Sequence, residues 1–187
     1  MSRASLLPQG AFDTHVHIFD PSLGPYSPGS ATYGSLLSFS KSISLVDEPA
    51  NLVIVQPSPY GTDNHILLSL LRQHQNTRAC IRGIAVANLD KVTDGELANM
   101  HSLGVRGLRL NLQAGGHGVD VAALEVRLRK AAEKIRHLPG WKLQLFIPAH
   151  VWDCKIDFRS TVIRGLLQLT HDTVQICIPQ SLIYPWL

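Results

Sequence analysis

The chain has 187 residues, 45% of them hydrophobic and 17% charged, with a formal net charge of +3 at pH 7. This balance predicts a folded domain and argues against a disordered chain. The basic residues are scattered, which argues against a nucleic-acid-binding protein. Three widely spaced cysteines, no signal-like segment and no apolar run of about 18 residues predict a soluble cytoplasmic protein that does not enter a membrane.

Apolar runs alternate with helical patterns over most of the chain. Short β-branched and apolar runs predict five strands, at residues 11–19, 51–56, 80–87, 105–112 and 141–147. Helices are predicted between them, at residues 62–75, 93–104 and 119–137. Thr62 or Asp63 can cap the first of these helices, and Thr93 with Glu96 forms a capping box for the second. The predicted fold is an α/β, TIM-type (β/α) barrel that is incomplete, with about five of eight βα units.

The βα pattern is lost after Pro148. Residues 161–169 predict a helix, but residues 153–187 contain no recognisable sixth strand with its helix. We therefore expect one domain over residues 1–187, with a half-barrel at 10–150 and an atypical, non-native tail at 151–187. A mis-assembled gene model and a truncated paralogue are the two explanations of such a tail. A barrel cut after five strands exposes sheet edges, which predicts self-association.

Two histidines in the first predicted strand, His15 and His17, give the strongest chemical signal. Residues i and i+2 of a strand project from the same face, so the two imidazoles are expected side by side. Such a pair suits a divalent ion such as zinc or manganese. Asp13 shares this face and is expected to orient a ligand histidine. The alternative is a strand with two incidental histidines.

Polar residues also follow the second and fourth predicted strands. Ser58, Tyr60 and Thr62 precede a helix N-terminus, where hydroxyls and backbone N–H groups can hold a carboxylate; an ordinary turn and helix cap is the alternative. Arg109 lies near the end of the fourth strand, where a guanidinium suits a carboxylate, unless it forms a structural ion pair. Tyr26, in the long loop after the first strand, is a further candidate lid or substrate contact.

The segment DTHVHIFDP at residues 13–21 resembles the opening of the amidohydrolase superfamily. Together with QPSPYGTDN at 56–64, RGIAVAN at 82–88 and GVRGLRLNL at 104–112, it is similar to the amidohydrolase-2 branch, which includes 2-pyrone-4,6-dicarboxylate lactonases. The resemblance implies a barrel hydrolase that opens a lactone or similar bond of a small carboxylated molecule. It also implies that Ser58, Tyr60 and Thr62, in the segment at residues 56–64, contact the substrate.

The same resemblance leaves the cofactor and the activity open. It implies either a divalent ion held by His15 and His17, or a metal-independent site in which these imidazoles form hydrogen bonds, as in lactonases of this branch. The family's water-activating Asp after the last barrel strand has no recognisable counterpart here, and His150 does not match the family's later histidine. Three hypotheses follow: a hydrolase, a non-catalytic half-barrel, and a metal-dependent decarboxylase with a similar His-x-His.

Overall fold

The computed structural model of the chain divides into two compact units, Met1–Ala85 and Val86–Leu187, which we call unit 1 and unit 2. The structure describes residues 10–20, 24–27, 51–77, 80–111, 120–148, 167–170 and 173–179. None of the helices within these ranges is long and apolar enough to cross a membrane.

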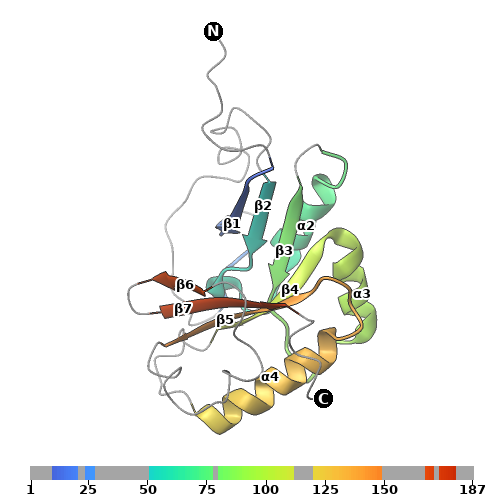
Figure 1. Cartoon of the computed structure of the whole chain (residues 1–187). Coiled ribbons are helices and arrows are strands. Elements are labelled where there is room, and N and C mark those ends of the chain that lie inside the picture. Colours follow the sequence, from blue (N-terminus) through green and yellow to red (C-terminus); the bar gives the residue numbers. More distant parts are fainter. Residues whose placement is uncertain are drawn as a thin grey trace. The chain divides into compact units, whose positions relative to one another are not determined.

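The described part of unit 1 is built on three parallel strands, β1 (Phe12–Val16), β2 (Asn51–Val55) and β3 (Ile81–Ala85). The 3-10 helix η1 (Ser58–Tyr60) and helix α2 (His65–Gln73) connect β2 to β3, as parallel pairing requires a crossover (Figure 1). Helix α2 forms because its apolar residues recur at helical spacing. Its buried stripe consists of Ile66, Leu67, Leu70 and Leu71.

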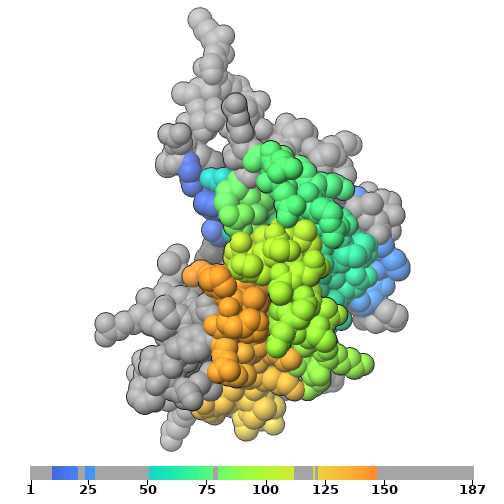
Figure 2. Space-filling view, turned by 90° about the vertical axis from the view of Figure 1, so that its right-hand side faces the viewer, coloured from blue at the N-terminus to red at the C-terminus, as the bar shows by residue number. Residues whose placement is uncertain are grey.

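Unit 2 begins with helix α3 (Asp94–Leu103), strand β4 (Val105–Asn111), helix α4 (Val121–Ile135) and strand β5 (Lys142–Pro148). Strands β4 and β5 are parallel, with α4 as their crossover. In the space-filling view, residues 86–111 adjoin residues 120–148 on the surface of this unit (Figure 2). The core of this unit contains Leu97, Leu108, Leu110, Leu124, Ile135, Trp141, Leu143 and Leu145.

Two further strands of unit 2 depart from the parallel pattern. Strand β7 (Thr173–Pro179) pairs with β5 in the antiparallel sense, and β6 (Leu167–Thr170) pairs with β7 in the same way (Figure 1). The helix predicted at residues 161–169 is therefore wrong for residues 167–169, while residues 161–166 lie outside the described ranges. The sequence Leu167–Thr170 alternates apolar and polar residues, which suits a strand.

The predicted strands and helices from residue 11 to residue 148 are confirmed in type, and their bounds differ by a few residues. The largest shifts are at β1, which ends at Val16, and at α2, which begins at His65 with Asn64 as its N-cap and no side-chain capping bond. Asp63 nevertheless accepts the backbone N–H of His65 at 3.1 Å. The predicted capping box of α3 is confirmed, because Thr93 accepts from the Glu96 N–H and Glu96 accepts from the Thr93 N–H.

Replacing Thr93 with alanine is expected to lower the free energy of unfolding by about 1 kcal/mol, since the first turn of α3 loses the side-chain acceptor of its capping box. Urea unfolding followed by circular dichroism measures this loss. Thr93→Ser keeps the hydroxyl acceptor and is the matched control. Equal destabilisation by the two variants would show that the capping bond is not the cause.

Trp141, the residue before β5, is fully buried and contacts the end of α3. Its Nε1–H donates to His101 Nδ1 at 2.9 Å, and the two rings are stacked with 6.5 Å between their centroids. Arg106 Nη1 donates to the backbone oxygen of His101 at 2.7 Å. Burial, with a smaller effect of the Arg106 charge, lowers the pKa of His101 below its ordinary value. His101 therefore favours the neutral state in which Nδ1 can accept a hydrogen bond.

The stability of the chain is expected to fall as the pH drops below the ordinary histidine pKa of 6.5. Because the folded pKa of His101 is lowered, the unfolded chain binds more protons below this pH, and the contribution of His101 is complete only above it. Urea midpoints between pH 7.5 and pH 5.5 measure the slope. His101→Gln is expected to flatten that slope, and an unchanged slope would rule out His101 as its source.

Candidate active site

The side chains of His15 and His17 meet at the end of β1, as predicted. Their Nε2 atoms lie 3.0 Å apart, and their ring centroids are 4.5 Å apart with an interplanar angle of 86°. Both residues are half-buried. The two Nε2 atoms are within hydrogen-bond distance of each other, so two ring nitrogens lie side by side where the first strand of unit 1 ends.

A backbone carbonyl of β2 sets the orientation of the second histidine. His17 Nδ1 lies 2.8 Å from the carbonyl oxygen of Val55, a buried residue. A carbonyl oxygen only accepts, so Nδ1 carries the proton and donates, and the neutral ring keeps its lone pair on Nε2. Histidines that bind metals usually donate their other N–H in this way. Strand pairing between β1 and β2 thus selects the tautomer that a metal ligand needs.

The Nε2 atoms of His15 and His17 provide part of the ligand set that a divalent ion needs. Zinc binds histidine nitrogens at about 2.0–2.1 Å, so two nitrogens 3.0 Å apart can reach one ion. Within the ranges that the structure describes, no group of three or more His, Cys, Asp or Glu side chains has the arrangement of a metal site. Asp13 does not orient an imidazole as expected, because its Oδ1 accepts the backbone N–H of His15 at 3.2 Å. The orienting contact comes from Val55 instead.

Residues 24–27 lie against the loop that follows β2, which brings Tyr26 and Tyr60 together with 5.2 Å between their ring centroids. The Ser27 N–H donates to the Pro59 carbonyl at 2.6 Å, and the Asp20 N–H donates to the Tyr60 hydroxyl at 2.8 Å. Burial raises the pKa of Tyr60, partly offset by the hydrogen bond from Asp20 and supported by Tyr26. Tyr60 therefore remains a neutral hydroxyl near pH 7.

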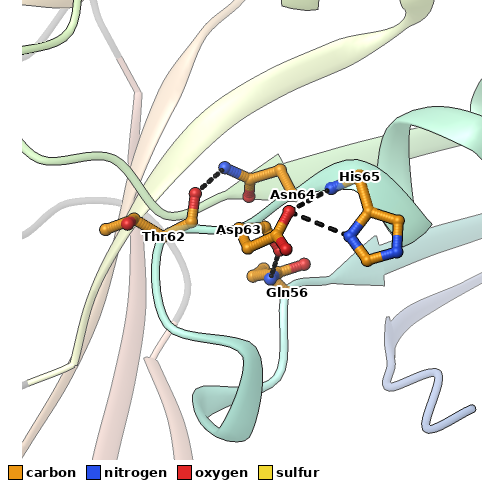
Figure 3. Close-up of polar contacts among 5 residues, drawn as sticks. All are labelled: Gln56, Thr62, Asp63, Asn64 and His65. Carbon is orange, nitrogen blue, oxygen red and sulfur yellow. Dashed lines mark hydrogen bonds and ion pairs between the residues drawn. The ribbon is translucent and has the colours of Figure 1, made fainter. Parts of the chain in front are cut away.

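The loop between β2 and α2 is held by hydrogen bonds from its own side chains (Figure 3). Gln56 Nε2 donates to the Asp63 carbonyl at 2.6 Å, and Asn64 Nδ2 donates to the Thr62 carbonyl at 3.0 Å. Asp63 Oδ1 also lies within hydrogen-bond distance of His65 Nδ1, at 2.9 Å. Burial alone would raise the pKa of Asp63, but the hydrogen bonds from His65 outweigh it and lower the pKa. The loop presents Thr62, and Ser58 at its start, as exposed residues.

Arg109 belongs to β4 of unit 2 and is buried, with 5% of its surface exposed. Its guanidinium lies over the Phe146 ring, 5.2 Å from the centroid. Burial lowers the pKa of Arg109 to about 10, so the group remains positively charged near pH 7. In the β4–β5 register Arg109 is aligned with Gln144, which is also buried. Arg109 is thus a buried cation with an aromatic and an amide neighbour.

The structure brings the predicted residues together in two groups within unit 1: His15 with His17, and Tyr26 with Tyr60. Arg109 is described within unit 2, and His150 lies outside the described residues. Sequence reasoning missed Gln144 and Phe146. The alternation in WKLQLFI was a usable signal, since it places a polar residue and an aromatic residue on one face of an otherwise apolar strand.

Parallel βα units with His-x-His on the first strand are typical of amidohydrolase-type barrels. The Amidohydrolase family model (Amidohydro_2) matches residues 12–171, and the chain belongs to this family. It is 28% identical over 168 residues to 2-pyrone-4,6-dicarboxylate hydrolase of Comamonas testosteroni, covering 84% of this chain and 51% of that protein. It is 24% identical over 173 residues to 4-sulfomuconolactone hydrolase of Rhizobium radiobacter, with coverages of 87% and 50%.

A solved structure supports the fold class. The crystal structure of a probable 2-pyrone-4,6-dicarboxylic acid hydrolase from Acinetobacter baumannii, with citric acid bound, matches with a TM-score of 0.58 and 28% identity. The match covers 75% of this chain and 50% of that one. The chain therefore has the fold of a partial TIM-type barrel, as predicted, and it spans about half the length of the curated relatives it matches.

Proposed function

We propose that the chain carries the His-x-His part of a hydrolase site that opens the lactone ring of a small carboxylated molecule. The observation behind this proposal is the pair of Nε2 atoms 3.0 Å apart, with His17 Nδ1 bound to the Val55 carbonyl. The family supports the reaction class, since two relatives are hydrolases of 2-pyrone-4,6-dicarboxylate and of 4-sulfomuconolactone. Both of these names describe small anionic molecules.

In this proposal His15 and His17 would hold a divalent ion, zinc or manganese, through their Nε2 atoms. A bound ion of this kind polarises a carbonyl and lowers the pKa of water. His17 contributes an orientation set by the Val55 carbonyl, which would keep its Nε2 available to the ion. His15, within β1, contacts the ring of His17, which directly follows that strand.

The proposed substrate contacts are a cation in unit 2 and, separately, a set of hydroxyls in unit 1. Arg109 stays charged despite its burial, and a buried guanidinium binds carboxylates strongly because water does not compete. Tyr60 provides a neutral hydroxyl, Tyr26 provides a second hydroxyl, and Ser58 and Thr62 are exposed in the loop between β2 and α2. These residue types suit a molecule with carboxylates and an ester carbonyl.

The test is the hydrolysis of 2-pyrone-4,6-dicarboxylate by the purified chain, with and without added zinc or manganese. Ring opening, followed by the loss of the pyrone absorbance, is the expected result, with no release of carbon dioxide. His15→Ala is expected to remove the activity. An unchanged absorbance under all metal conditions contradicts the proposal, and release of carbon dioxide would indicate a decarboxylase.

A further inference from the structure

Gln144 is a buried amide whose acceptor is unused. The residue is 1% exposed, and its Oε1 has no hydrogen-bond partner in the part of the chain that the structure describes. Buried acceptors are rarely left in this state, because the group loses its water without gaining a partner. An unpartnered buried acceptor therefore points to a missing donor.

The position of Gln144 in the sheet indicates where that donor comes from. Gln144 is aligned with Arg109 in the parallel register of β4 and β5, so the two side chains project from the same face. Phe146, two residues further on, shares this face and lies under the Arg109 guanidinium. The opposite face is apolar and consists of Leu108, Leu110, Leu143 and Leu145, all of them buried. The acceptor thus lies on the polar face and not on the leucine face.

We infer that Arg109 and Gln144 together form a subsite for a carboxylate that has a hydroxyl on the neighbouring carbon. The guanidinium binds the carboxylate, and Gln144 Oε1 accepts the hydrogen bond of the hydroxyl. The ring of Phe146 packs against the guanidinium. This inference rests on the proposed function, in which Arg109 is a substrate contact, and it names the class of ligand that Arg109 binds.

Lactone hydrolysis produces such a ligand. Water adds its OH to the ester carbonyl carbon and its proton to the ring oxygen as the C–O bond breaks. If the carbon attached to the ring oxygen carries a carboxylate, the opened molecule has a hydroxyl next to that carboxylate, which the closed ring lacks. Gln144 therefore discriminates in favour of the opened form.

The first test compares two dicarboxylates that differ by one hydroxyl, racemic malate and succinate, titrated into the whole chain in a calorimeter. Malate is expected to bind about tenfold more tightly, as one hydrogen bond to a buried acceptor provides. Equal affinities, or no binding of either acid, would overturn the inference. This comparison needs no variant and decides the question even if substitutions in β5 disturb folding.

The second test removes the acceptor. Gln144→Met has a similar volume and no amide, so it is expected to bring the affinity ratio of malate to succinate close to one, with succinate binding retained. Its melting temperature is expected to stay equal or rise, because no buried acceptor is left without a partner. Arg109→Met is expected to weaken both acids, and Gln73→Met, at an exposed position of α2, to weaken neither. Malate preference that persists in Gln144→Met contradicts the assignment.

The two proposals can fail separately. If the chain opens no lactone yet prefers malate through Gln144, the subsite stands and the hydrolase proposal falls. If the chain opens the lactone but binds malate and succinate equally, the hydrolase proposal stands and the role of Gln144 is wrong.

Discussion

His17→Ala is expected to abolish the binding of zinc to the chain, as measured by calorimetric titration. The substitution removes one of two Nε2 donors that lie 3.0 Å apart, and it removes the ring whose tautomer Val55 fixes. Losing an outer partner of a metal ligand costs about 10–100-fold in affinity, and losing the ligand itself costs more. Any lactone hydrolysis that depends on the ion is expected to disappear with it.

The control for this prediction is His137→Ala. His137 is an exposed histidine just beyond α4, and its removal changes the histidine count without touching β1. Zinc affinity is expected to remain unchanged in this variant. If His17→Ala binds zinc as tightly as the unmodified chain, the ion is held elsewhere and the His-x-His assignment fails.

The largest expected loss of stability comes from Trp141→Ala. The side chain is fully buried, so the substitution leaves a cavity and costs about 3–5 kcal/mol of unfolding free energy. It also removes the donor to His101 Nδ1. Trp141→Phe keeps much of the volume but loses the donor, so it is expected to cost about 1–3 kcal/mol.

Urea unfolding monitored by circular dichroism measures both Trp141 variants. Val126→Ala, on the exposed side of α4, is the matched control, since truncation of a side chain that is 65% exposed is expected to change stability by less than about 0.5 kcal/mol. A loss for Trp141→Ala no greater than that of the control would mean that the α3–β5 contact adds little to the stability of unit 2.

The fold up to residue 148 could be predicted because local signals and burial agree there. Helix α3 is an example: the capping box at Thr93 marks its start and Gly104, with a φ of 109°, marks its end. The antiparallel pairing of β7 could not be predicted, since no local signal in its sequence specifies which strand it pairs with. Strand direction depends on contacts that are distant in the sequence.

The candidate site was predictable where spacing alone decides the geometry. Strand spacing predicted that the rings of His15 and His17 lie side by side, and they do, although β1 ends at Val16 and His17 follows it. The carbonyl of Val55 could not be foreseen, because a backbone acceptor carries no residue signature and the β1–β2 register brings it into place. Gln144 was missed for a related reason, since its meaning depends on its alignment with Arg109 across two strands.

The antiparallel strand β7 has a consequence for hydrogen exchange in β5. Strand β5 pairs with β4 along one edge and with β7 along the other, where seven register pairs run from Lys142↔Pro179 to Pro148↔Thr173. Its amides therefore have partners in both directions. A further parallel strand can pair with β5 only at the edge that β7 occupies, so β7 would have to leave first. Deuterium uptake at β5 would then report on that exchange, rising while β7 leaves and falling when the new strand has paired.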